Sequence, residues 1–233
     1  MNKEHFWPQW LIEKTGAKGV RHSANKRVNP RSLKVPLCKK CNSDFGDALE
    51  VPVSKIVRDL EGGDGLSDSE AEILVRWLWK FEGLNWIFDH PAQRYTERYT
   101  LRDRVLNPID EIREELTLAV SLVAAINPRF DDEPMGLDSW NEQSAVFVAG
   151  VFGRIAMMVL LSQFESEVPD AYSLYRFAHR DAPDRSTKLF FPKTGFTDCV
   201  EAVGVSMRAG GWLSYAHDRE MRDRVAAAQR RPL

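Results

Sequence analysis

The stretch LCKKCNSDFGDALE, residues 37–50, leads into the segment on which the fold prediction depends. From Asn42 to Leu60, large apolar residues recur at spacings of three or four, which is the period of a helix with one buried face. Pro52 is expected to kink or split this helix, because proline has no N–H to donate within it. The apolar positions are Phe45, Leu49, Val53, Ile56 and Leu60.

The chain changes character on both sides of this segment. Residues 15–36 are rich in Gly, Asn, Pro and Ser, which predicts a long loop with at most short strands. The glycines of EGGDGLSDSE, residues 61–70, break the helix. We therefore place a boundary there, between a unit of residues 1–62 and a second unit of residues 63–233. Ser67 and Glu70 form a capping box that would start the next helix.

The second unit is predicted to be mainly helical. Apolar residues have helical spacing over 68–88, and residues 108–126 begin with Pro108 and acidic residues, as helices often do. Ser139 and Glu142 form a second capping box, which would open a long apolar helix to about Phe164. Residues 186–205 are more β-like and predict a hairpin or an extended arm, and 215–231 predict a surface helix. The expected fold class is α+β, mostly α.

The composition is typical of a globular protein in a reducing compartment. The 233 residues are 43% hydrophobic and 28% charged, and the formal net charge of −2 does not indicate a polyanion binder. Three cysteines argue against a disulfide framework, and MNKEHFWPQW lacks the apolar core of a signal peptide, so we expect a cytoplasmic protein. The apolar run 145–161 has Arg154 near its centre and predicts a buried helix rather than a membrane span.

One local segment departs from this near-neutral balance. Nine basic residues and no acidic residue occur between positions 14 and 40. Such a segment is either a solvated loop or a surface that contacts phosphates, which needs positive charge but little sequence information. The candidate contacts to nucleic acid are Lys14, Lys18, Arg21, Lys26, Arg27, Arg31, Lys34, Lys39 and Lys40.

Two motifs lie near the ends of this basic segment, and the second overlaps it. The first is EHFWPQWL, residues 4–11, and the second is VPLCKKCN, residues 35–42, followed by the pair Leu49-Glu50. An acid beside a histidine is common by chance, but its pairing with C-x-x-C-N about 30 residues later is not. In these motifs, over roughly residues 3–51, the chain resembles the HNH endonucleases of the ββα-metal type. The resemblance implies a small N-terminal ββα unit that cuts DNA with the help of a divalent metal, in a phage, a mobile element or a defence system.

The resemblance also assigns roles to individual residues. His5 matches the general base that activates the attacking water, a task that suits an imidazole with a pKa near neutrality. Glu4 and Asn42 match the acid and the last motif residue that hold the divalent ion, which would be Mg²⁺ or a similar ion such as Mn²⁺ or Ni²⁺. Cys38 and Cys41 match one half of the structural zinc site of the family.

The chain departs from the family pattern at three points. The middle Asn of the motif is missing before Cys38, and Asn29 replaces it only if the loop is offset. Glu4 stands where the family usually has Asp. A second C-x-x-C pair, which the family places before the E-H motif, is absent from this sequence, so a zinc ion at Cys38 and Cys41 would need other ligands such as His22 or Cys199.

These departures leave three readings open. The first is the DNA-cutting nuclease. The second is a degenerate HNH fold that binds nucleic acid or a protein partner without cutting, and a homo-oligomer is compatible with either reading. The third and weaker reading takes Cys38 and Cys41 as a redox pair, which would be expected in a βαβ context that this mostly helical sequence does not show. Glu50, in the Leu49-Glu50 pair, would either brace the site or be an ordinary surface acid.

Overall fold

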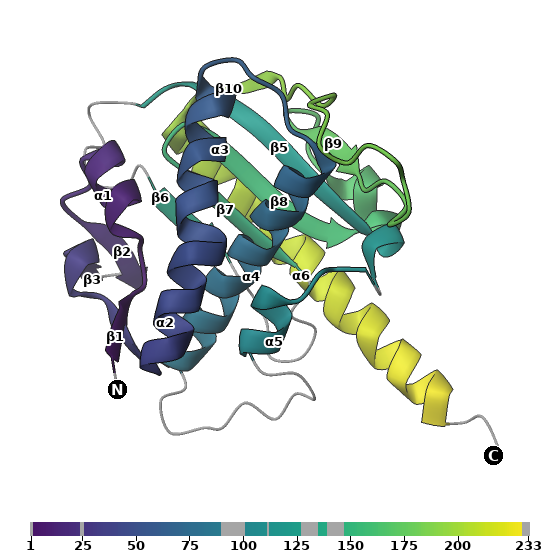
Figure 1. Ribbon diagram of the computed structural model, residues 1–233, viewed down its shortest axis with the longest axis horizontal. Helices are drawn as coiled ribbons and strands as arrows, with labels where there is room; N and C mark the ends of the chain where they lie inside the picture. Colours follow the sequence, from purple (N-terminus) through teal and green to yellow (C-terminus); the bar gives the residue numbers. More distant parts are fainter. Residues whose placement is uncertain are drawn as a thin grey trace.

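A computed structural model of the chain describes residues 2–23, 26–89, 101–110, 112–126, 135–138 and 147–229. It confirms a mixed α+β fold, in which a small N-terminal hairpin is followed by helices and a larger sheet (Figure 1). The predicted capping box of Ser139 and Glu142 lies outside the described residues. Within them, no helix is long and apolar enough to cross a membrane.

The N-terminal part pairs two short strands that carry the two motifs. β1 (Asn2–His5) runs antiparallel to β4 (Lys34–Leu37), with Glu4 opposite Val35 and His5 opposite Lys34. Between them come α1 (Gln9–Thr15), the hairpin of β2 (Val20–Ser23) and β3 (Lys26–Val28), and a 3-10 turn, η1 (Pro30–Ser32). The prediction of a long loop with short strands over 15–36 is confirmed.

The segment that opens at residue 37 is helical, as its periodicity predicts. It contains α2 (Lys39–Phe45), a π-helical turn η2 (Gly46–Glu50) and α3 (Val51–Glu61). Pro52 is the second residue of α3, where its missing N–H costs little because the preceding turn is already irregular. Phe45, Leu49 and Leu60 are buried on the predicted face.

The next helix, α4 (Asp68–Asp89), begins at the predicted capping box. The Glu70 backbone N–H donates to Ser67 Oγ at 3.2 Å, and the Ser67 N–H donates to Glu70 Oε2 at 2.9 Å. These two bonds satisfy donors that the first turn of a helix leaves unpaired. A short helix, α5 (Leu101–Leu106), packs against α4.

The predicted helices over 108–126 and 139–164 are wrong where the structure describes these residues. Their place is taken by β5 (Leu116–Ala125), β6 (Met135–Asp138), β7 (Val148–Phe152) and β8 (Ile155–Leu161), together with the 3-10 turns η3 (Arg113–Glu115) and η5 (Ser162–Glu167). With β10 (Thr194–Asp198), the strand order is β10-β5-β8-β7-β6, and β9 (Ser173–Arg176) also pairs with β5. The run 145–161 is therefore buried, as predicted, but as a hairpin.

The physical reason for this error is that both faces of the sheet are buried. Leu118, Val120 and Met157 belong to the apolar core on the α4 side, whereas Ala119 and Met158 belong to the core on the other side. A strand that is buried on both faces has no polar alternation, so its sequence cannot be distinguished from a buried helix by period alone.

A turn between β7 and β8 closes the central hairpin. Phe152 pairs with Ile155, so the loop between them consists of Gly153 and Arg154. Gly153 has a φ of 67°, a left-handed conformation that tight hairpin turns require and that glycine adopts without steric cost.

The second face of the sheet is covered by the long helix α6 (Cys199–Gln229). It follows β10 (Thr194–Asp198), so the predicted β-like segment 186–205 is a strand only in its middle, and the predicted helix 215–231 is confirmed as far as residue 229. Figure 1 shows α3 and α4 in front of the sheet and α6 behind it, with the C-terminal half of α6 extending beyond the sheet.

One apolar core joins the first 62 residues to the rest of the chain. It includes Trp7 from the N-terminal part, Trp77 and Phe81 from α4, and Phe152 from β7. The ring centroids of Trp77 and Phe152 are 4.7 Å apart, and those of Trp7 and Phe81 are 5.3 Å apart. Packing is therefore continuous across the segment 61–70, where the sequence suggests a boundary.

His217 of α6 is fully buried and hydrogen-bonded on both ring nitrogens. Its Nε2 accepts from the Leu161 N–H at 2.9 Å, and its Nδ1 donates to the Leu213 carbonyl at 2.7 Å. Burial lowers the pKa of His217 below its usual value of 6.5, so the folded state holds the neutral ring.

We expect this histidine to make stability depend on pH. Because its pKa is lowered in the folded state, its contribution is complete above about pH 6.5 and is lost as the pH falls, by up to about 1.4 kcal/mol per pH unit. Urea unfolding at pH 7.5, 6.5 and 5.5 measures the slope. His217→Gln should have a shallower slope than the wild type, whereas the control His179→Gln, at an exposed histidine, should not. Equal slopes in all three proteins would contradict the assignment.

Candidate functional site

His5 lies at the end of β1, and its surroundings favour the neutral imidazole that a general base requires. Its ring is partly buried, and its Nδ1 atom is buried with no hydrogen-bond partner. Partial burial and the positive charges of Lys34 and Arg31 lower the pKa of His5, although Glu4 acts in the opposite direction. A neutral imidazole with an unpaired nitrogen can accept a proton at neutral pH.

Asn42 lies in α2, which packs against β1. Cys38 caps this helix, because its Sγ accepts from the Cys41 N–H at 2.9 Å and its carbonyl accepts from the Asn42 N–H at 3.0 Å. The side-chain Oδ1 of Asn42 is buried and has no hydrogen-bond partner. Buried polar atoms are nearly always paired, so an amide oxygen and an imidazole nitrogen that both lack partners, on two elements that pack together, are a reason to expect a ligand.

Glu4 has a partner of its own. Neighbouring side chains on a strand point to opposite faces, so Glu4 and His5 diverge from β1. Glu4 Oε1 accepts from Lys80 Nζ at 2.6 Å, and the same ammonium donates to Glu50 Oε1 at 2.6 Å. Burial by itself would lower the pKa of Lys80, but Glu50 and Glu4 raise it above its ordinary value, so the lysine stays charged.

Glu50 is mostly buried and joins several segments through its carboxylate, so it is not an ordinary surface acid. Its Oε2 accepts from Trp10 Nε1 at 2.9 Å, and its Oε1 accepts from Trp77 Nε1 at 3.2 Å in addition to Lys80. Trp10 belongs to the first motif and Glu50 follows the second, so this contact gives a structural reason for the two motifs to occur together. Lys80 was not among the residues predicted from the sequence, although a lysine inside the largely apolar run RWLWKFEGL is an available signal.

The two motif cysteines are close together, and within the described ranges no further side chain joins them in a metal-binding group. Cys38 and Cys41 are joined as a disulfide, with Cα atoms 5.2 Å apart. Cys199 is buried in the apolar cluster on the α6 side of the sheet, whereas Cys41 borders the cluster on the α4 side, so Cys199 does not complete a zinc site. The side chain of His22 lies outside the described part of the chain. Among the described residues, no three His, Cys, Asp or Glu side chains form a metal-binding group.

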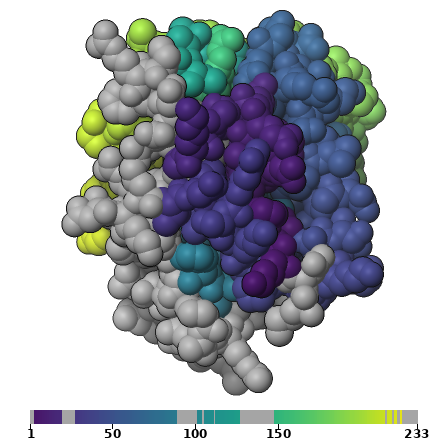
Figure 2. Space-filling view, turned by 90° about the vertical axis from the view of Figure 1, so that its left-hand side faces the viewer, coloured from purple at the N-terminus to yellow at the C-terminus, as the bar shows by residue number. Residues whose placement is uncertain are grey.

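The basic residues of the N-terminal part are divided between ion pairs and exposed surface. Lys14 pairs with Glu61, and Lys40 pairs with Asp44 at 3.1 Å. Hydrogen bonds from Lys40 and Arg102 lower the pKa of Asp44. Lys14 and Lys40 are nonetheless exposed, as are Lys18, Arg31, Lys34 and Lys39, and the side chains of Arg21, Lys26 and Arg27 lie outside the described part. Figure 2 shows many of the described residues among the first 50 lying side by side on the face in view.

None of the protein families, curated proteins and solved structures compared with this chain matches it. Its function is therefore inferred from its own residues and their arrangement.

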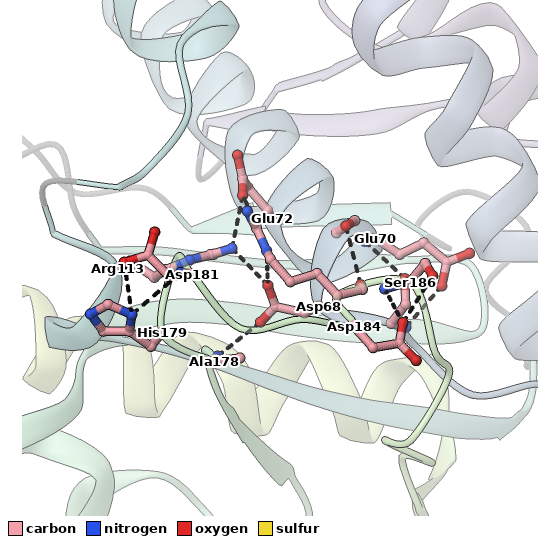
Figure 3. A network of polar contacts seen from close by, with 12 residues as sticks. Asp68, Glu70, Glu72, Arg113, Ala178, His179, Asp181, Asp184 and Ser186 are labelled. Atoms are coloured by element: carbon pink, nitrogen blue, oxygen red, sulfur yellow. Dashed lines mark hydrogen bonds and ion pairs between the residues drawn. The ribbon is translucent and has the colours of Figure 1, made fainter.

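A second polar cluster, at the other end of α4, was not predicted from the sequence. Asp68 accepts a hydrogen bond from the Ala178 N–H at 2.9 Å and pairs with Arg113 at 2.7 Å (Figure 3). It also accepts from Tyr175 Oη and pairs with Arg185, each at 2.7 Å. Burial is the main reason that the pKa of Tyr175 is raised, and the contact with Asp68 adds to it. The cluster ties the loop that follows β9 to the start of α4.

Arg113 also lines a pocket of about 290 Å³ beside this cluster. Its Nη2 atom contacts Asp68 and Glu72, whereas its buried Nε and Nη1 atoms have no hydrogen-bond partner. The other lining residues carry both signs of charge, so the pocket does not select one class of charged ligand. They are Asp110, Ile112, Glu114, Glu115, His179 and Arg180.

Proposed function

We propose that this chain is a metal-dependent endonuclease that hydrolyses phosphodiester bonds of DNA, with a site built from β1, β4 and α2. The observation that carries the proposal is the pair of orphaned buried atoms, His5 Nδ1 and Asn42 Oδ1, on two elements that pack together. These two atoms belong to the residues that match the general base and a metal ligand of the family that the motifs resemble.

The residues present fit a hard divalent ion in part. The Asn42 amide oxygen is a ligand type that Mg²⁺ and Mn²⁺ accept, and it has no protein partner to give up. The Glu4 carboxylate is also a ligand type that such ions accept, but its Oε1 is held by Lys80 and its side chain leaves β1 on the face opposite His5. When bound, such an ion would stabilise negative charge on the scissile phosphate and on the leaving oxygen.

The other residues have roles that follow from their chemistry. Neutral His5 takes a proton from the attacking water through its unpaired ring nitrogen. Lys34, opposite His5 on β4, and the exposed Arg31 supply positive charge beside the ring and favour the approach of a phosphate backbone. Because their contacts are to phosphates, we expect weak dependence on DNA sequence and strong dependence on salt.

The test is cleavage of plasmid DNA with Mg²⁺, Mn²⁺ or Ni²⁺ by the wild type and by His5→Ala. We expect cleavage that requires the metal and falls by at least about 100-fold in His5→Ala, the usual loss when a general base is removed. His179→Ala, which removes an exposed histidine outside the site, is the matched control and should cleave like the wild type. Equal rates for His5→Ala and the wild type would exclude His5 as the base.

One observation favours a second function. Glu4 Oε1 already accepts a hydrogen bond from Lys80, as it would in a fold that has lost its metal and now only binds nucleic acid. In that case the same plasmid would be bound but not cut with any of the three metals. Affinity would fall steeply as the salt concentration rises, because binding to phosphates releases counterions.

A further inference from the structure

We infer that Cys38 and Cys41 form a redox-active site, a disulfide that opens and closes reversibly by exchange with small thiols at the Cys38 sulfur. The inference goes beyond the proposed function and does not depend on it, because thiol–disulfide exchange requires neither a metal nor DNA. The site lies at the first turn of α2, the helix that carries Asn42.

The disulfide is too local to be a staple of the fold. Cys38 and Cys41 are three residues apart in the sequence, and their Cα atoms are 5.2 Å apart. A disulfide stabilises a fold mainly by restricting the unfolded chain, and this effect is small when the closed loop is short. The pairing of β1 with β4 and the packing of α2 on β1 hold this part of the chain without it. Opening the bond should therefore leave the fold in place.

The two cysteines differ in their access to solvent. Cys38 is exposed, whereas Cys41 is half-buried and packs against the apolar core on the α4 side of the sheet. Exchange begins when a thiolate attacks one sulfur of a disulfide, and access helps to decide which sulfur is attacked. Cys38 is therefore the residue that is attacked from solution, and Cys41 is the residue that is released.

The hydrogen bonds around Cys38 are compatible with both redox states. Its Sγ accepts from the Cys41 N–H at 2.9 Å, and its carbonyl accepts from the Asn42 N–H at 3.0 Å. Neither hydrogen bond requires a covalent bond between the two sulfurs. The first turn of α2 can therefore keep its cap when the disulfide is reduced, which is what a reversible pair needs.

A structural zinc ion does not fit these cysteines as well as a disulfide does. Such an ion almost always takes four ligands in a tetrahedral arrangement. Within the described ranges, no third His, Cys, Asp or Glu joins Cys38 and Cys41 in a metal-binding group. The pair therefore departs from the zinc site of the family that the motifs resemble, and a disulfide satisfies both sulfurs without further residues.

The exchange reaction needs only a thiol reductant. A thiolate attacks Cys38 Sγ, the bond between the two cysteine sulfurs breaks, and its electron pair goes to Cys41 Sγ, which takes up a proton. A second thiolate then attacks the sulfur of the reductant in this mixed disulfide, and Cys38 leaves and is protonated. The cysteine pair gains two electrons and two protons, and the two thiols of the reductant are oxidised to one disulfide.

The experiment counts the free thiols of the folded, full-length protein by alkylation with N-ethylmaleimide and intact-mass spectrometry. We expect no label after treatment with oxidised glutathione, two labels after reduced glutathione or dithiothreitol, and an unchanged circular dichroism spectrum throughout. Glutathione is used because structural disulfides typically resist it, whereas exposed, labile ones do not. Cys199 is fully buried and is the internal control, which should be labelled only after unfolding.

A second measurement identifies the sulfur that is attacked. Cys41→Ser leaves Cys38 as the only cysteine of the pair, and Cys38→Ser leaves Cys41. With oxidised glutathione, we expect Cys41→Ser to form the mixed disulfide at least about 10-fold faster than Cys38→Ser, because exchange depends on access to the sulfur. The thiol count on the wild type needs no substitution, so it tests the inference even if a variant does not fold.

Three results would overturn the inference. The first is labelling of Cys38 and Cys41 that requires unfolding, and the second is a bound zinc ion that protects both cysteines until a chelator is added. The third is an equal rate of mixed-disulfide formation in the two variants, which would exclude Cys38 as the attacked residue. None of these results depends on DNA cleavage, so failure of the inference and failure of the nuclease proposal are separate outcomes.

Discussion

Replacing Asp68 with alanine is expected to lower the free energy of unfolding by about 3–5 kcal/mol, the usual cost of breaking a buried ion pair from one side. Asp68 accepts from Tyr175, the Ala178 N–H, Arg113 and Arg185. Without it, the buried guanidinium of Arg113 keeps only Glu72 as a hydrogen-bond acceptor among the described residues. Urea unfolding followed by circular dichroism measures the loss.

The control for this variant is Asp64→Ala. Asp64 lies just before the same helix, but its carboxylate is exposed. Its ion pair is long, with 3.8 Å between Asp64 Oδ2 and Lys188 Nζ. We expect a change of about 0.5 kcal/mol or less, as for most surface substitutions. A comparable loss in the two variants would mean that the Asp68 cluster contributes no more than a surface ion pair.

Replacing Phe152 with alanine is expected to cost about 3–5 kcal/mol and to destabilise the N-terminal part together with the sheet. Phe152 is fully buried, and its ring lies 4.7 Å from that of Trp77 and 5.4 Å from that of Phe81, centre to centre. It also contacts Trp7 of the first 62 residues at 6.3 Å. Because the rings form one cluster, a cavity at residue 152 should destabilise the parts of the chain on both sides of the segment 61–70.

Two probes test this second prediction. Tryptophan fluorescence reports on the cluster that contains Trp7 and Trp77, and far-ultraviolet circular dichroism reports on the helices and strands. We expect their unfolding curves to coincide in both the wild type and Phe152→Ala, as in a single cooperative transition. Phe191→Ala removes a ring that is 64% exposed and should change stability little. Separate transitions would contradict a shared core and would instead support two independently folding units.

The contrast between the helices and the sheet shows which parts of the fold were predictable. The helix after Asn42 and the start of α4 at Ser67 depend on spacing and capping among neighbouring residues, so sequence alone reveals them. β5 and β8 were predicted as helices because both of their faces are buried and neither shows a period. Whether such a run becomes a strand or a helix depends on what covers its two faces, which is a property of the whole fold.

The candidate site divides in the same way. The sequence by itself determined which residues carry the motifs: Glu4 and His5 at one end, and Cys38, Cys41 and Asn42 at the other. Only the tertiary structure decided that Glu50 accepts from Trp10, 40 residues away, and that Glu4 meets Lys80, 76 residues away. The physical reason is that residue type and spacing specify local chemistry and local backbone. The partner of a buried charge, by contrast, depends on which elements pack together, and a single sequence gives little indication of this packing.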